Sequence, residues 1–158
     1  MALDQDFKLA MRRLAATVNI ITIRDGDRPM GMAATAVSSL AADPPSLLVC
    51  VNQTASMHNL LIEAEAFCIN ILHQDQHDVA TVFSDTKMRD ARFATGQWEH
   101  REDAPPYLLD AQAVLLCERR QLITFATHTI CIGAVREIRL RDDIDPLLYV
   151  DGRFARAG

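Results

Sequence analysis

The stretch that decides the fold is Gly31-Met32-Ala33-Ala34-Thr35-Ala36-Val37-Ser38-Ser39-Leu40, followed at once by Asp43-Pro44-Pro45-Ser46-Leu47-Leu48-Val49-Cys50-Val51-Asn52. Most side chains in its first half are small or carry a hydroxyl group, so an extended segment would leave its peptide N–H groups uncovered. The second half is rich in β-forming residues, and a Pro-Pro turn connects the two. The pattern predicts two strands that form a cradle of peptide groups, against which a flat ligand can lie.

The length and composition limit what the chain can be. Its 158 residues suit one domain, 1–158, and the composition of 49% hydrophobic and 23% charged residues is typical of a globular protein. A net charge of −5 argues against nucleic-acid binding, which needs clustered lysine and arginine. The sequence has no apolar run long enough to span a membrane and no signal-peptide pattern, so we expect a cytoplasmic protein without membrane contact.

The cysteines suggest the same compartment. Cys50, Cys68, Cys117 and Cys131 are widely spaced in apolar, strand-like runs. No pair has the spacing of metal ligands, so we expect reduced thiols in the core and no metal site.

Hydrophobic periodicity predicts a mainly β fold with peripheral α-helices. We expect helices over 3–14, with Asp4 as its cap, over 56–64, capped by Thr54 or Ser56, and from Asp75 onward. The expected strands are 18–24, 46–52, 67–72, 111–127, 128–140 and 147–150, with a polar, irregular segment over 86–106. Adjacent hairpins disfavour a parallel sheet and favour an antiparallel barrel. Side chains fill such a small barrel, so a sizeable ligand would lie on its outer wall or between subunits, which points to an oligomer.

Several common sites are excluded. No two glycines form the G-x-G or P-loop patterns, and no G-x-S-x-G motif is present. His73 and His77 have i, i+4 spacing, but a solvent-facing first helical turn is the favoured interpretation over a metal site. His58 could contact a ligand or cap a helix, and the residues alone leave both open.

Two further positions carry competing interpretations. His128 begins a strand in phase with Ile130 and Ile132, and on its residues alone a core-edge imidazole is favoured over a ligand contact. Arg92-Phe93 is either a surface pair or a phosphate clamp, because a guanidinium group offers a planar fork to phosphate oxygens.

Seven segments in order, from Phe7 to Phe154, resemble the short-chain flavin reductases, which have the antiparallel, Greek-key-type FMN-binding split barrel. They are 16–22, 31–39, 44–49, 67–72, Arg92-Phe93 with Trp98, Thr127-His128 and 146–149. The pattern is similar to reductase components of two-component flavin-dependent monooxygenases, such as the 4-hydroxyphenylacetate 3-monooxygenase reductase.

The resemblance implies an NAD(P)H:flavin oxidoreductase, a homodimer that reduces FMN or FAD with NADH or NADPH and supplies reduced flavin to a monooxygenase. It implies that His128 and Tyr149 border the nicotinamide and that the flavin ring lies along 35–39 and 50–52. The phosphate would lie among 56, 58, 59 and 92, with two phenylalanines closing the pocket. The implied cofactor-binding residues are Thr35, Ala36, Val37, Ser38, Ser39, Cys50, Val51, Asn52, Ser56, His58, Asn59, Phe83, Arg92, Phe93 and Tyr149.

The sequence departs from the family pattern in two places, and its residues also allow two other functions. Ala126 stands where relatives commonly have glycine, and the chain ends four residues after Phe154, so a C-terminal cover would be short. The alternatives are a non-catalytic flavin-binding protein that stores or senses the cofactor and a ligand-free interaction domain. The weak basic pairing near the nicotinamide position favours NADH over NADPH.

Overall fold

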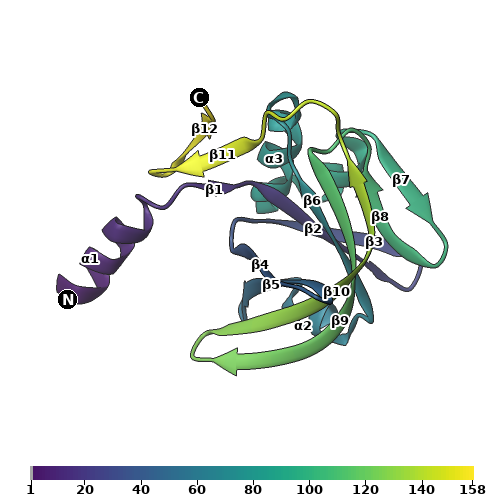
Figure 1. Cartoon of the computed structure of the whole chain (residues 1–158), viewed down its shortest axis with the longest axis horizontal. Coiled ribbons are helices and arrows are strands. Elements are labelled where there is room, and N and C mark those ends of the chain that lie inside the picture. Colours follow the sequence, from purple (N-terminus) through teal and green to yellow (C-terminus); the bar gives the residue numbers. More distant parts are fainter. Residues whose placement is uncertain (1) are drawn as a thin grey trace.

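The computed structural model describes residues 2–158, and its main element is one seven-stranded antiparallel sheet (Figure 1). The strand order is β3-β2-β6-β9-β10-β5-β4. Their bounds are β2 Asn19–Asp25, β3 Arg28–Ala34, β4 Val37–Ala42, β5 Pro45–Asn52, β6 Ala66–Ile71, β9 Ala113–Phe125 and β10 His128–Leu140. The two edge strands, β3 and β4, are consecutive in the chain and joined through Thr35-Ala36. The sheet therefore curls into an antiparallel barrel, as the sequence predicts, and the barrel stays split at this link.

Smaller elements surround this sheet. A three-stranded sheet contains β1 (Ala16–Thr17), β11 (Leu147–Val150) and β12 (Arg153–Arg156), and a hairpin contains β7 (Trp98–Arg101) and β8 (Ala104–Leu108). The helices are α1 (Ala2–Met11), α2 (His58–Glu63) and α3 (His77–Ser84), with 3₁₀ turns at η1 (Gln74–Gln76) and η2 (Thr86–Ala94). Figure 1 shows α1 projecting from the body beside the β11–β12 hairpin.

The core has two parts because β2 is buried on both faces. Ile21 and Ile23 point into the barrel with Phe67 of β6, whereas Ile20 points to the other side, toward Phe83 of α3. Alternation along a strand sends successive side chains to opposite faces, so one strand serves both clusters. The barrel cluster leaves no space beside Gly133 of β10, where a Cβ atom would lie 2.6 Å from the ring of Phe67.

The expectation of an irregular 86–106 segment is wrong. Thr86–Ala94 forms the turns of η2, and β7 and β8 form a hairpin. Two tertiary hydrogen bonds hold the hairpin on the sheet: Thr22 Oγ1 donates to the Pro106 carbonyl at 2.7 Å, and the Leu108 N–H donates to Asn70 Oδ1 at 2.8 Å. Local sequence carries no sign of partners so distant in the chain.

The predicted helix caps are also wrong. Asp4 lies within the first turn of α1, which begins at Ala2. Met57 occupies the cap position of α2 without a side-chain hydrogen bond, and Thr54 instead donates its hydroxyl to Asn52 Oδ1 at 2.9 Å.

His73 does not face solvent, contrary to the sequence-based interpretation. It is 5% exposed and caps η1, accepting a hydrogen bond from the Asp75 N–H, while its Nε2 lies 2.8 Å from Asp143 Oδ2. Arg141 lies 2.7 Å from a carboxylate oxygen of each aspartate, and these hydrogen bonds hold the pKa of both carboxyl groups below its usual range. The network attaches the segment leading into β11 to the body of the protein. His77, by contrast, is exposed, as expected.

Candidate functional site

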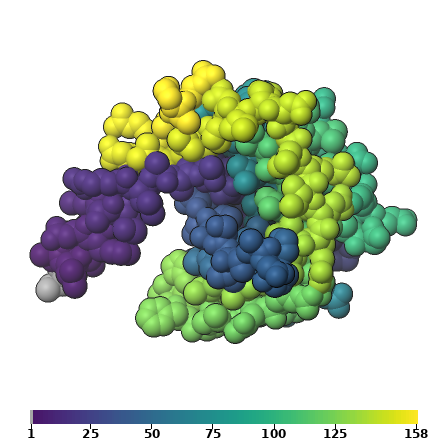
Figure 2. All heavy atoms as spheres, in the orientation of Figure 1, coloured from purple at the N-terminus to yellow at the C-terminus, as the bar shows by residue number. Residues whose placement is uncertain are grey.

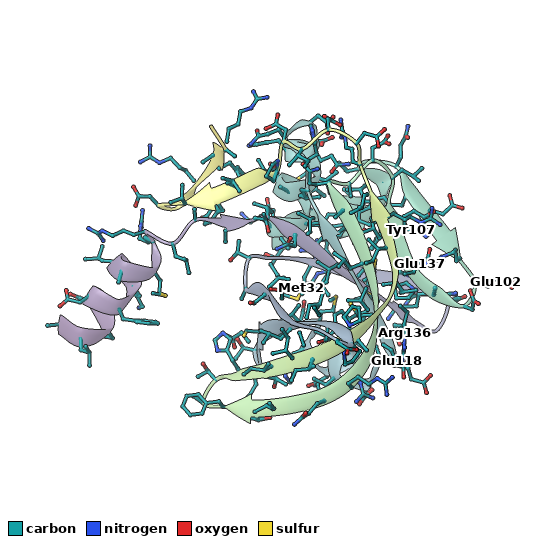
Figure 3. The ribbon with its side chains drawn as sticks, in the orientation of Figure 1. Met32, Glu102, Tyr107, Glu118, Arg136 and Glu137 are labelled. Atoms are coloured by element: carbon teal, nitrogen blue, oxygen red, sulfur yellow. The ribbon has the colours of Figure 1, made fainter. Side chains whose placement is uncertain are left out.

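A cavity of about 580 Å³ lies where the split in the barrel meets the β11–β12 hairpin. Its walls come from the end of β3, the link that follows it, the end of β5, the start of β10 and the C-terminal hairpin. The lining residues are Val18, Met32, Ala33, Ala34, Thr35, Ala36, Cys50, Val51, Asn52, Ala55, Ser84, His128, Tyr149, Gly152, Arg153 and Phe154. Met32, which lines the cavity, is labelled near the middle of Figure 3. Glu118 and Arg136, also labelled there, pair at 2.9 Å between β9 and β10 and do not line the cavity.

The link between β3 and β4 lines this cavity and contains two peptide donors without a backbone partner. The carbonyl of Ala36 accepts the Cys50 N–H at 3.0 Å, and the carbonyl of Thr35 accepts the Val37 N–H at 2.9 Å. Within residues 2–158, the N–H groups of Thr35 and Ala36 themselves have no hydrogen-bond acceptor. Both residues are exposed and line the cavity. These N–H groups are therefore available to a ligand's acceptor atoms.

His128 lines the same cavity at the start of β10, where β10 pairs with β5. It is the partner of Asn52 in the ladder, is exposed, and has Nδ1 2.8 Å from Thr127 Oγ1. The core-edge interpretation is wrong: the side of β10 that enters the core carries Thr129 and Cys131, which alternate with His128 and the half-buried Ile130.

Tyr149 of β11 lines the cavity and is 39% exposed. Its ring lies 5.7 Å from that of Phe154 on β12. The two aromatic rings form the wall contributed by the C-terminal hairpin. The C-terminal hairpin thus reaches the cavity.

Of the predicted cofactor-binding residues, the structure brings six together with His128 around this cavity and places nine elsewhere. The six are Thr35, Ala36, Cys50, Val51, Asn52 and Tyr149. Three others, Val37, Ser38 and Ser39, lie on edge strand β4 and do not line it. The remaining six are Ser56, His58, Asn59, Phe83, Arg92 and Phe93.

His58 has partners within the protein. It is 7% exposed, its Nε2 lies 2.8 Å from Thr129 Oγ1 and its Nδ1 lies 3.1 Å from Asn59 Oδ1. This geometry fits a histidine that joins α2 to β10. Its predicted contact with a ligand phosphate stays a prediction.

The aromatic residues form a cluster behind β3. Phe83 lies 5.3 Å from Phe93, and Trp98 lies 4.9 Å from Phe93, measured between ring centroids. A Cβ atom on Gly31 would lie 2.7 Å from the Phe83 ring, so β3 packs directly on this cluster.

Arg92 is buried beneath the same strand, with 8% of its surface exposed. Its Nη1 donates to the Gly31 carbonyl at 2.9 Å, its Nη2 to the Asp85 carbonyl at 3.5 Å, and its Nε has no partner within the described residues. Burial, and then the neighbouring Arg89, lower the pKa of Arg92. The guanidinium group therefore supports the edge strand.

Arg89, one turn before Arg92, is a residue that the sequence reasoning missed. Its Nη2 donates to Ser56 Oγ at 3.3 Å, and with Arg28 and Arg92 it lines a second cavity of about 480 Å³. Three guanidinium groups against the single carboxylate of Asp90 make this cavity suited to an anion. The i, i+3 spacing of the two arginines was the available signal.

The sequence reasoning also missed part of the main cavity's wall. Ala33 and Ala34 belong to the stretch that decides the fold, but Arg153 and Phe154 come from the far end of the chain. Only the three-dimensional pairing of β1 with β11 reveals that proximity.

The thiols are free, and no group of three or more potential metal-binding side chains occurs among residues 2–158. Burial raises the pKa of Cys68 and Cys117 to about 12 and that of Cys131 to about 11. Cys50 is half-buried in the cavity wall. Across the described residues, no helix is long and apolar enough to cross a membrane.

Residues 11–158 match the flavin reductase like domain family. The chain belongs to this family. It is 38% identical to the reductase component of the FADH(2)-dependent resorcinol hydroxylase of Rhizobium sp., over 97% of this chain and 87% of that protein. It is also 38% identical to the FMN reductase (NADH) RutF of Pseudomonas syringae pv. syringae, over 94% of this chain and 83% of the relative.

Solved flavin reductase structures have the same fold. The Streptomyces globisporus NADH:FAD oxidoreductase SgcE6, in complex with NAD and FAD fragments, matches with a TM-score of 0.90 and 28% identity, over 98% of this chain and 93% of that one. BorF, the flavin reductase component of a bacterial two-component tryptophan halogenase, matches with a TM-score of 0.87 and 28% identity, over 97% of each chain. The split-barrel fold expected from the sequence is thereby confirmed.

Proposed function

We propose that this chain is an NADH-dependent flavin reductase that reduces FMN or FAD and supplies the reduced flavin to a partner oxygenase. The observation that carries the proposal is the cavity at the split of the barrel, which is lined by Thr35 and Ala36, whose peptide N–H groups have no backbone acceptor within residues 2–158. Family membership and relatives named as FMN reductase (NADH) and as a hydroxylase's reductase component support it.

The cavity fits a flavin ring in size and chemistry. Its volume of about 580 Å³ falls within the range of small-molecule sites. The side chains of Ala33, Ala34 and Ala36 are small, so a flat ring can approach the backbone of this wall. The free N–H groups of Thr35 and Ala36 suit carbonyl or nitrogen acceptors on the edge of such a ring.

Hydride transfer is the chemistry that the nicotinamide and flavin supply when bound. The chain's residues would bind and orient them. We assign the peptide groups of Thr35 and Ala36 to the flavin ring and His128 and Tyr149 to the nicotinamide. Ser56 and Arg89, which contact each other, are the best-placed donors for the flavin phosphate. Arg92 is buried and already donates to the Gly31 and Asp85 carbonyls, so we assign it the role of supporting β3 next to this phosphate site.

Exposed apolar side chains favour a homodimer. On α1, Leu3 is 82% exposed, and at the tip of the β9–β10 hairpin Phe125 is 77% exposed. Figure 2 shows the space between these two projecting elements as a hollow. Large apolar side chains exposed on both elements are typical of an interaction site. We propose that a second copy of the chain covers this surface.

We also propose that the protein acts in the cytoplasm, where its free thiols stay reduced.

The test is NADH oxidation by the purified protein with FMN, with FAD and without flavin, followed at 340 nm. We expect turnover only when flavin is present. Tight flavin binding without turnover would instead identify a storage or sensing protein. Failure to bind either flavin would leave an interaction domain.

A further inference from the structure

Strand β12 forms part of the cavity wall but has little support within its own sheet. It is four residues long, and among residues 2–158 it pairs only with β11, which in turn pairs with the two-residue β1. Small antiparallel sheets of this kind are marginally stable in water. β12 nevertheless carries the Phe154 ring to the cavity. Contacts from outside the sheet must therefore fix where this ring lies.

Gln74, in η1, supplies one such contact. Its Nε2 donates to the Ala155 carbonyl of β12 at 2.7 Å and to the Pro146 carbonyl, just before β11, at 3.3 Å. The Gln74 N–H donates to the Asp145 carbonyl at 2.9 Å. The side chain is half-buried, so water competes little for these bonds. One amide group therefore joins both arms of the hairpin to η1.

His77, the first residue of α3, supplies the other contact. Its ring centroid lies 4.4 Å from that of Phe154, in an edge-to-face arrangement. The Phe154 ring in turn lies 5.7 Å from that of Tyr149, and both of these rings line the cavity. His77 is exposed and does not line the cavity, so it contacts the aromatic wall from outside. Figure 1 shows α3 at the end of the hairpin that is farther from α1, away from the surface that we assign to a second copy.

We propose that Gln74 and His77 are positioning residues, which hold the Phe154–Tyr149 wall in the place where it can border the nicotinamide. The inference rests on the proposed function. Hydride transfer requires the two reacting rings to be closely aligned, so a displaced wall would impair the use of NADH. The flavin ring, which we assign to the peptide groups of Thr35 and Ala36, lies on a different wall. Its binding should therefore be insensitive to both residues.

His77→Ala, made in the full chain, tests the ring contact. We expect the KM for NADH to rise about three-fold, within the range that an edge-to-face aromatic pair contributes, while the Kd for FMN stays unchanged. His77→Phe keeps a ring at this position and should restore the KM. His100→Ala is the matched control, because His100 is also exposed and lies 6.2 Å from a phenylalanine, Phe93, but neither residue lines the cavity.

Gln74→Ala and Gln74→Glu test the amide donor. A carboxylate has nearly the same shape as the amide but cannot donate to the two carbonyl groups. Both variants should therefore raise the KM for NADH, by about five-fold for the loss of two hydrogen bonds, and the glutamate should not rescue. Gln97→Ala is the control, since Gln97 is exposed and outside the cavity.

A fluorine NMR spectrum reports the wall without any turnover. The chain has two tyrosines, Tyr107 and Tyr149, so protein labelled with fluorotyrosine should give two resonances, which Tyr107→Phe assigns. Tyr107 is buried and does not line the cavity, which makes it an internal reference. His77→Ala and Gln74→Ala should shift or broaden the Tyr149 resonance alone. His100→Ala should change neither resonance.

The proposal is overturned if His77→Ala and Gln74→Ala leave the KM for NADH and the Tyr149 resonance unchanged. It is also overturned if His77→Phe behaves like His77→Ala, or if the variants weaken FMN binding as much as the use of NADH. If Gln74→Ala does not fold, the two His77 variants decide. If the wild type oxidises NADH with neither flavin, the proposed function fails. The Tyr149 resonance then decides alone whether these residues position the wall.

Discussion

Replacing Arg92 distinguishes a structural support from a phosphate ligand, the two roles that its sequence and its structure suggest. Arg92→Ala removes a buried, charged donor that lies 2.9 Å from the Gly31 carbonyl. A hydrogen bond to a charged group contributes about 1.5–3 kcal/mol, and the carbonyl left behind would be unsatisfied. The side chain also packs against Phe83, with its guanidinium carbon 5.7 Å from the ring centre. We therefore expect the free energy of unfolding to fall by about 2–4 kcal/mol.

The assay is urea unfolding followed by the fluorescence of Trp98, the sole tryptophan, whose ring lies 5.3 Å from that of Phe83. Arg89→Ala is the matched variant. Its hydrogen bond to Ser56 is exposed, so unfolding should change by less than about 0.5 kcal/mol while flavin affinity weakens. Unchanged stability of Arg92→Ala together with a large loss of flavin affinity would refute this reasoning and make Arg92 the phosphate ligand.

Three other perturbations have expected outcomes. His128→Ala should raise the KM for NADH with little change in unfolding free energy, because the side chain is exposed at the cavity; steady-state kinetics and urea unfolding check both. Ala126→Gly should raise the free energy of unfolding by about 1 kcal/mol, since Ala126 has φ of +50° at the β9–β10 turn, and an unchanged urea midpoint would contradict this. The Asp75 carboxyl has a lowered pKa through its contact with Arg141, so its stabilisation is present above pH ~4 and is lost as pH falls through the lowered value. Acid titration of wild type and Arg141→Gln should show the smaller loss in the variant.

Strong local patterns predicted the strands, and distant contacts account for what was missed. The predicted strand 46–52 is β5, and the two long runs form the β9–β10 hairpin, because β-branched residues and turns define them locally. The β7–β8 hairpin depends on hydrogen bonds from Thr22 and to Asn70, far away in the chain.

The residues of the candidate site also divide into those that local sequence could predict and those that depend on distant contacts. Thr35, Ala36 and Asn52 belong to the stretch that decides the fold, so their clustering follows from the β4–β5 pairing. Arg153 and Phe154 reach the cavity only because β11 pairs with β1 at the opposite end of the chain. The burial of His73 likewise depends on Asp143, 70 residues later.

The distribution of thiols makes the cavity addressable by covalent chemistry without any mutation. Only thiolates react readily with alkylating reagents, and three of the four cysteines are buried with raised pKa values. Cys50 is the half-buried one, in the wall of the main cavity. A maleimide or iodoacetamide should thus modify the wild-type protein at a single position, and the labelling rate would report whether that wall is covered.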